Sequence, residues 1–339
     1  FQDILTSNYQ KIIKDQISHN MNFNVENFIS APNESLSLNP SHDANGAFTN
    51  LFISWGDTNV ALILKGEELL KPKIEIIKDN DLISQEQTKN ILDKISDWLE
   101  INYLKKIDLT SNLNKFNGTA QERGFIFKLN ENQFNFYQIN ILDEFKTIEE
   151  RKRKEIHAMN FRLGKNVIFN SELIRPEYMK VKFYLWNIFH DVNLSLDSYI
   201  PKDGNSTLNI ENKLNEKLVS FLGFILQNDL LIRIDIFNEF EKQLFKRENR
   251  GPFSLPMDLS NLLGIKKDKL IKILQDRSFS IQEVEENDLV ISKKIKINKT
   301  LSIKKNKKLL KTRQKKVKET STKNLFNNPF DQLRDINAK

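Results

Sequence analysis

Few side chains in this sequence have the type and spacing that chemistry requires. The four histidines, His19, His42, His157 and His190, lie far apart, and none has a histidine partner four residues away. A zinc site needs three or four ligands that converge on the metal, and the chain has no cysteine to supply one. We therefore predict no metal site and no disulfide, and interpret the histidines as ordinary surface or core residues.

Motifs that bind nucleotide phosphates or activate a nucleophile are absent from the sequence. A phosphate-binding loop reads G-x-x-x-x-G-K-[ST], whereas the segment Gly164–Asn166 lacks both the upstream glycine and the hydroxyl residue. The segment Asp143–Lys146 begins like an acidic box, but Lys146 stands where an acid or histidine is expected. No serine lies in G-x-S-x-G and no carboxylate pair stands out. We predict no catalytic residues, and an autonomous hydrolase is the least favoured function.

The strongest chemical signal is a run of positive charge near the C-terminus. The segment Lys293–Lys318 contains 13 Lys or Arg residues and no acid, so the net charge of +7 leaves −6 for the rest of the chain. Clustered cations bind a polyanion by releasing its counterions, which makes binding independent of sequence and sensitive to salt. We predict nucleic-acid contacts at Lys304, Lys305, Lys307, Lys308, Lys311, Arg313, Lys315 and Lys316.

Two other interpretations of this basic segment stay open. A coding bias that enriches the chain in lysine could also produce many of its charges without a binding function. The segment could contact an anionic membrane surface, or only keep the chain in solution; we favour nucleic acid. Its few apolar residues cannot offset the entropy of ordering it, so we expect a disordered tail. Beyond it, Phe326, Phe330 and Leu333 form an apolar island. Such islands dock on protein partners, and a chance cluster is the equal alternative.

The rest of the chain predicts an α+β fold that is mainly helical, with two short β-hairpins or small sheets. The segments 48–55 and 59–64 flank Gly56-Asp57 as the first hairpin, and 221–227 and 230–234 flank Asn228-Asp229 as the second. Ser84 and Gln87 form a capping box that starts a helix. Further helices are expected at residues 121–136, at 141–159, from Pro176, and from a cap at Asp235.

Residues 257–290 form the last predicted unit. Two short helices separated by Gly264 precede strands at 279–284 and 289–291, which is typical of a winged-helix-like unit. Such a unit binds nucleic acid or serves only as a small packing domain. The predicted organisation is a truncated helical segment at 1–29, a linker at 30–46, a mixed α/β accessory domain at 47–215, a small hairpin-helix domain with the winged-helix-like end at 216–292, and the disordered basic tail at 293–339.

Several segments, in order, resemble one family. They are Trp55–Leu62, Gly66, Leu70–Pro72, Arg123–Asn132, Phe161–Gly164, Leu173–Pro176, Leu185-Trp186, Gly223-Phe224, Ile232–Glu239, Leu262–Gly264 and Ile273-Leu274. Together they are similar to the region beyond the motor in bacterial helicase-related proteins, superfamily 2 enzymes akin to the mitochondrial degradosome RNA helicase. The segment His157–Asn160 departs from the pattern, since a more basic helix end is expected there.

The resemblance implies that a full-length relative hydrolyses ATP and unwinds RNA or DNA with upstream lobes. ATP and magnesium would bind those lobes, so no cofactor is expected in this chain. We expect a non-catalytic C-terminal accessory region that supports the motor lobes and contacts RNA or DNA largely regardless of sequence. The absence of cysteine, of a signal peptide and of an apolar run of ~18 residues fits a cytoplasmic setting without a membrane partner. The alternative is a protein-interaction scaffold with a partner-docking tail.

Overall fold

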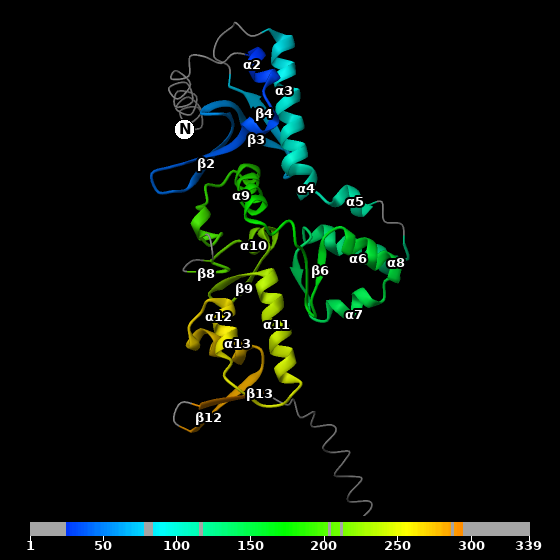
Figure 1. The fold of residues 1–339 in the computed structure, drawn as a ribbon, viewed down its shortest axis with the longest axis vertical. Coiled ribbons are helices and arrows are strands. Elements are labelled where there is room, and N and C mark those ends of the chain that lie inside the picture. The colour runs from blue at the N-terminus through cyan, green and yellow to red at the C-terminus, as the bar shows by residue number, and fades with distance from the viewer. Residues whose placement is uncertain are drawn as a thin grey trace, which may run out of the picture.

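The computed structural model describes residues 25–77, 84–114, 118–202, 205–210, 213–285 and 288–293. These residues form an elongated body with the N-terminal sheet at one end and the last helices and strands at the other (Figure 1). Helices alternate with four small antiparallel sheets, so the predicted mixture of helix and sheet is confirmed. The sheets contain more strands than the two predicted hairpins supply.

The first sheet is four-stranded, in the order β1 (Leu36–His42), β2 (Phe48–Trp55), β3 (Thr58–Glu68) and β4 (Lys71–Ile76). The predicted hairpin is confirmed, since Trp55 pairs with Thr58 across Gly56-Asp57. The predicted linker at 30–46 is wrong, because β1 lies within it and pairs with β2. Pro40 does not prevent this, since β1 is an edge strand and an edge strand tolerates a missing N–H.

A long helix and a central helix enclose this sheet. The structure has α2 (Val25–Ser30), α3 (Gln85–Leu99), the π-helical turn η2 (Glu100–Leu104), α4 (Lys105–Ile107) and, further along the chain, α9 (Pro176–His190). The Ser84–Gln87 capping box is confirmed, with each side chain accepting from the other residue's N–H. α3 packs on β4, and α9 packs on β2 and β3. The predicted start of α9 at Pro176 is also confirmed.

A middle segment contains the elements α5 (Thr110–Asn114), α6 (Ala120–Glu131), β5 (Phe136–Tyr137), α7 (Ile141–Lys146), α8 (Glu150–Ala158), β6 (Phe161–Leu163) and β7 (Val167–Asn170). Its strands lie in the order β5-β7-β6. The predicted helix at 121–136 ends at Glu131. The predicted helix at 141–159 is two helices, because Ile148 turns into the core and the Glu149 N–H donates to the Glu122 carboxylate.

The next segment contains η3 (Leu196–Ser198), β8 (Thr207–Asn209), α10 (Glu216–Leu222), β9 (Phe224–Gln227) and β10 (Leu230–Arg233). The second hairpin is confirmed around Asn228-Asp229, although it begins at Phe224 because the preceding residues are helical. β8 pairs with β10. The polar stretch before α10 therefore contributes a strand to this sheet.

The last segment contains α11 (Ile234–Glu248), β11 (Phe253–Ser254), α12 (Met257–Leu263), α13 (Lys267–Asp276), β12 (Phe279–Glu285) and β13 (Asp288–Lys293). The predicted pair of short helices and the strands after them are confirmed. Asp235 does not cap α11; it lies in the first turn and pairs with Arg233 at 2.7 Å.

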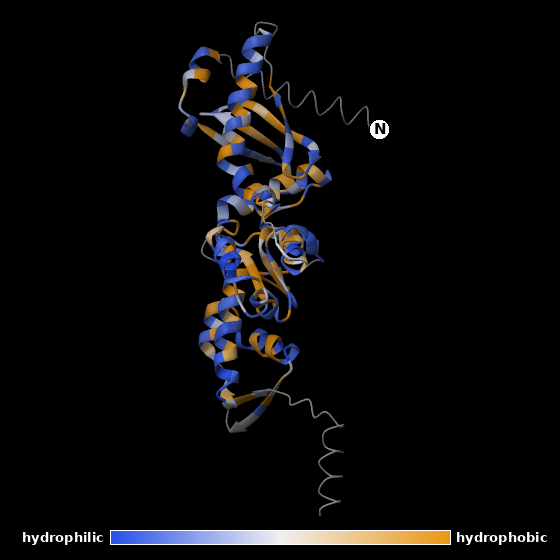
Figure 2. Ribbon diagram, turned by 90° about the vertical axis from the view of Figure 1, so that its right-hand side faces the viewer, coloured by the Kyte–Doolittle hydropathy of each residue, from blue (hydrophilic) through white to orange (hydrophobic). Residues whose placement is uncertain are grey.

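Two apolar cores hold these elements together. The first reaches from Phe28 on α2 to Leu231 on β10 and includes α10, which the predicted boundary at residue 216 separates from it. The second joins β7 and β10 to the last three helices and to β12 and β13. Figure 2 shows apolar residues along the inward strands and polar residues on the outer helix faces. Within the described residues, no helix is both long and apolar enough to cross a membrane.

Candidate nucleic-acid interface

The residues predicted to bind nucleic acid and a protein partner lie outside the described residues. The first set is Lys304, Lys305, Lys307, Lys308, Lys311, Arg313, Lys315 and Lys316, and the second is Phe326, Phe330 and Leu333. The described part of the chain ends at Lys293, where the basic segment begins. The part of the predicted interface that the structure can describe is therefore the folded unit that immediately precedes the basic segment.

This folded unit, α11 to β13, has the element order of a winged helix. A helix, a short strand and two further helices precede a two-stranded hairpin, and the strands lie in the order β11-β13-β12. Gly264 ends α12 with a φ of +62°, a conformation that glycine adopts without strain. The Ile265 N–H then donates to the Ser260 carbonyl and fixes the turn. In a helix-turn-helix the second helix, here α13, faces nucleic acid.

The start of α13 carries a cluster of cations. Its apolar face lies in the second core and comprises Leu270, Ile273 and Leu274. Four lysines lie at its start and along its first turns: Lys266, Lys267, Lys269 and Lys272. Asp268 is the only acid between residues 266 and 275. Lys266 and Lys272 are exposed, and the partial positive charge of the helix N-terminus adds to theirs.

Polar contacts fix the start of α13 against β8. The Lys269 ammonium donates to Asn209 Oδ1, and the Thr207 hydroxyl donates to the Leu263 carbonyl at 2.8 Å. β8 therefore supports the turn before α13. Because these contacts hold the helix in place, its lysines have a defined position relative to the second core.

The hairpin after α13 has the opposite charge. The sequence from 283 to 288 contains four acids, Glu283, Glu285, Glu286 and Asp288. In a winged helix this hairpin is the wing, and acids there repel phosphate. We therefore expect α13, rather than the wing, to contact nucleic acid in this chain.

At its other end, α13 joins a polar cluster between the two cores. Arg277 Nη1 lies 2.5 Å from Glu241 Oε1 on α11, and Asn166 Nδ2 lies 3.1 Å from the same oxygen. The Arg277 guanidinium carbon is 4.8 Å from the centre of the Phe237 ring. Tyr137 lies beside the cluster, and burial raises the pKa of its phenol above the ordinary value. These contacts bind α13, α11 and the β6–β7 turn into one body.

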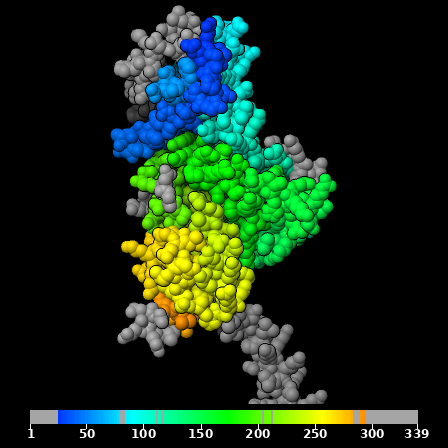
Figure 3. All heavy atoms as spheres, in the orientation of Figure 1, coloured from blue at the N-terminus to red at the C-terminus, as the bar shows by residue number. Residues whose placement is uncertain are grey.

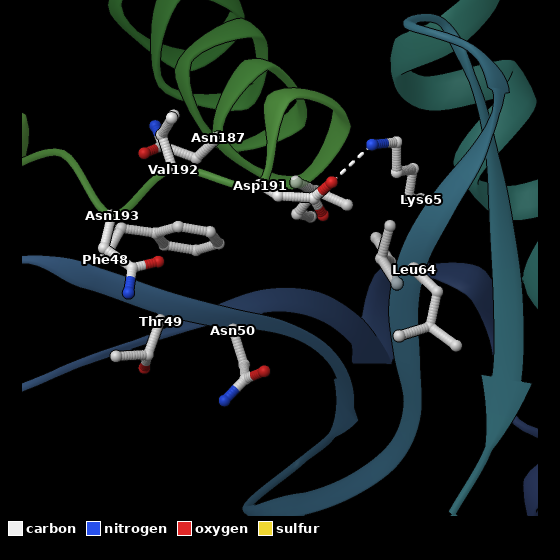
Figure 4. Close-up of a pocket in the computed structure, with 11 residues that line it drawn as sticks. Phe48, Thr49, Asn50, Leu64, Lys65, Asn187, Asp191, Val192 and Asn193 are labelled. Carbon is white, nitrogen blue, oxygen red and sulfur yellow. Dashed lines mark hydrogen bonds and ion pairs between the residues drawn. The ribbon is translucent and has the colours of Figure 1, made fainter. Parts of the chain in front are cut away.

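A pocket of about 430 Å³ lies between the β2–β3 hairpin and the end of α9 (Figure 4). Its polar lining residues include Thr49, Asn50 and Asn193. Its two charged residues, Lys65 and Asp191, form an ion pair with each other at the rim. The lining contains no histidine and no pair of acids.

The histidines within the described residues make structural contacts. The His42 ring lies edge-on to Phe48, the His157 Nδ1 is 3.1 Å from the Phe161 carbonyl oxygen, and the His190 ring lies 4.2 Å from that of Trp186. Among the residues that the structure describes, no three His, Cys, Asp or Glu side chains gather as a metal site would require. His19 lies outside the described residues.

The acidic segment Asp143–Lys146 is also structural in its contacts. It lies in α7, where Asp143 pairs with Lys146 and Glu144 pairs with Lys128 at 2.7 Å. Phe145 is buried in the first core. The side chains of this segment are therefore engaged in holding α7 to α6.

Two buried ionisable groups have strongly shifted pKa values. Hydrogen bonds from the Lys152 ammonium and from the Thr119 and Glu149 N–H groups lower the pKa of Glu122 to about 2. Burial lowers the pKa of Lys182 on α9 to about 7. Glu122 joins the starts of α6 and α8, and Lys182 lies between α9 and α10. Both groups lie within the first core, away from α13.

Comparisons with protein-family models, with curated proteins and with solved structures each found no match for this chain.

The lysines of α13 are candidate interface residues that are missing from the set predicted from the sequence. A signal for them exists, since four lysines follow Gly264 within eight residues. The longer run of positive charge after Lys293 is a stronger signal in the sequence. The sequence predicts the short helix that carries these lysines, and the structure adds that its apolar face is buried in the second core.

Proposed function

We propose that this chain is a non-catalytic nucleic-acid-binding region in which α13 and the basic segment after β13 contact the phosphate backbone together. The observation that carries the proposal is the lysine cluster on the second helix of a helix-turn-helix, in a unit that leads directly into 13 cations. Phosphate contacts position a protein on nucleic acid without reading its sequence. The chain thus provides one ordered contact and one adaptable contact.

The proposal places the chain beside the motor lobes of a superfamily 2 helicase in a cytoplasmic setting. ATP and magnesium would be bound by those lobes, and this chain would scaffold them and guide a strand of RNA or DNA. The resemblance of its sequence segments, in their order along the chain, to helicase-related proteins supports this role. We also propose a mainly helical fold for the whole chain. The basic residues after β13 would contact nucleic acid, and Phe326, Phe330 and Leu333 would contact a protein partner.

Neutralising two exposed lysines of α13 is expected to weaken nucleic-acid binding. A chain with Lys266→Gln and Lys272→Gln should bind RNA and DNA of every sequence less tightly. The slope of log affinity against log salt should fall by about 1 to 2, because ~0.7 to 0.9 counterions are released per phosphate contact. Fluorescence anisotropy of labelled oligonucleotides across a salt series measures both quantities.

The matched control removes two exposed lysines from the first sheet and α3, with Lys73→Gln and Lys89→Gln. It changes the net charge equally and should leave the slope nearly unchanged. Equal slopes in the two variants would remove α13 from the interface. A second chain that ends at Ser292 tests the basic segment separately. If the full chain binds no oligonucleotide at low salt, the proposal fails and the scaffold alternative takes its place.

A further inference from the structure

An exposed aromatic surface lies where the two cores meet. It consists of Tyr137, Ile139, Lys165 and Phe245, and we call it the junction surface. Its three apolar residues are among the large hydrophobic side chains that stay exposed, with Ile139 at 69%, Tyr137 at 41% and Phe245 at 39%. Exposed apolar groups that gather in one place indicate an interaction site more strongly than scattered ones do.

The four residues come from three segments that hydrogen bonds hold together. The Gln138 N–H donates to the Asn166 carbonyl, and the Asn140 N–H donates to Asn166 Oδ1, so the backbone on both sides of Ile139 is tied to the β6–β7 turn. Tyr137 pairs with Val167 in the same sheet. The Asn166 amide then reaches Glu241 on α11, one helical turn before Phe245. The three segments that carry these four residues are therefore held to one another.

Gly164 allows the β6–β7 turn to approach α11. A Cβ at this position would lie 1.8 Å from Asn238 Oδ1 on α11 and 2.9 Å from Val167 Cγ2. A larger residue would require the Asn238 and Val167 side chains to shift. The close approach places the Lys165 ammonium 4.1 Å from the centre of the Phe245 ring. The Lys165 ammonium thus covers one face of the Phe245 ring, and the other face is the one that a base can stack on.

The charge around the junction surface favours an anionic ligand. Lys165 is exposed, and within the described residues no carboxylate forms an ion pair with it. Lys246 is exposed on α11 beside Phe245, whereas the exposed Lys242 pairs with Glu239 at 3.3 Å. The nearest buried acid, Glu241, is already paired with Arg277. Aromatic rings combined with cations match the two components of a single strand, whose bases stack on rings and whose phosphates attract lysine.

We propose that the junction surface is a stacking platform for unpaired bases of single-stranded nucleic acid. Tyr137 and Phe245 contribute rings, and Lys165 contributes the phosphate contact. Arg277, at the C-terminal end of α13, contacts Glu241 and Phe237 on α11, so α13 and the junction surface belong to one body. In Figure 3 the yellow atoms of the last segment adjoin the green atoms of the middle of the chain. This inference rests on the proposed function, and it adds that the ligand is single-stranded.

The platform is tested by removing the rings singly, with Tyr137→Leu and with Phe245→Leu. The probes are a labelled 20-nucleotide oligouridine and an RNA duplex of the same length. Each variant should bind the single strand about fivefold or more weakly, because stacking contributes ~1 to 3 kcal/mol per base. Duplex affinity and the salt slope should stay as in the unaltered chain. Phe127→Leu is the matched control, since Phe127 is 60% exposed on α6.

Photocrosslinking gives a second test that does not depend on the measured affinities. Oligouridine that carries 4-thiouridine should crosslink on irradiation to peptides that contain Tyr137 or Phe245, mapped by mass spectrometry. Unchanged single-strand affinity in both ring variants, or equal losses for strand and duplex, overturns the platform. If the Lys266/Lys272 variant still lowers affinity in that case, the proposed function stands without it. If the full chain binds neither probe, both fail, and a protein partner becomes the occupant to test.

Discussion

Replacing Glu241 with alanine is expected to lower the free energy of unfolding by roughly 3–5 kcal/mol, the usual cost of removing one partner from a buried ion pair. Glu241 is 6% exposed and pairs with Arg277, which is itself largely covered. Without the carboxylate, the guanidinium stays buried against Phe237 with no opposite charge, and the Asn166 amide loses its acceptor. Chemical denaturation monitored by tryptophan fluorescence measures the change.

The control for this prediction removes both charges at once. A chain with Glu241→Leu and Arg277→Met leaves no unpaired charge, so it should lose much less stability than the alanine variant. If the double variant is as unstable as Glu241→Ala, the loss comes from packing and not from the ion pair. The Asn166 contact also positions the β6–β7 turn, so Glu241→Ala should weaken single-strand binding at the junction surface too.

Local sequence signals predict a large part of the fold because they depend on neighbouring residues. The Ser84 capping box, the hairpin turn at Gly56-Asp57 and the Pro176 helix start each act within a few residues. The two short helices around Gly264 follow from the same kind of signal. These features can be predicted without knowledge of the tertiary structure, and the structure confirms them.

The predictions that are wrong lie where contacts between distant parts of the chain determine the local structure. β1 has the Asn, Ser and Pro content of a loop, and it becomes a strand because β2 offers an edge to pair with. Residues 141–159 have the charge pattern of one helix, but Ile148 is drawn into the core and divides it. The junction surface could not be predicted at all. Tyr137, Lys165 and Phe245 are far apart in sequence, and only the folded sheet and helix bring them together.

Lys182 is expected to make the stability of the chain rise between pH 7 and pH 9. Its side chain is 1% exposed, and its ammonium donates to the Phe221 carbonyl near the end of α10 at 2.6 Å. The Phe221 ring centre lies 5.3 Å away. Burial lowers its pKa from 10.5 to about 7. The carbonyl at the helix end favours the cation, but this single contact does not replace the lost hydration.

The direction of the pH effect follows from proton binding in the two states. Between pH 7 and pH 10.5 the unfolded chain holds a proton on Lys182 that the folded chain largely lacks. Stability therefore increases with pH in this window and is nearly flat below about pH 6, where both states are protonated. For a folded pKa near 7, the increase from pH 7 to pH 9 amounts to about 2 kcal/mol.

Lys182→Met isolates this contribution, because methionine keeps most of the length without the charge. The variant should be at least as stable as the unaltered chain at pH 7, and should lack the increase of about 2 kcal/mol towards pH 9. Urea denaturation at pH 6, 7 and 9 gives the difference. Lys180→Met makes the same replacement at a half-buried lysine of α9 and should keep the increase. If Lys182→Met keeps it as well, the pH dependence has another source, and Lys182 is protonated throughout this range despite its burial.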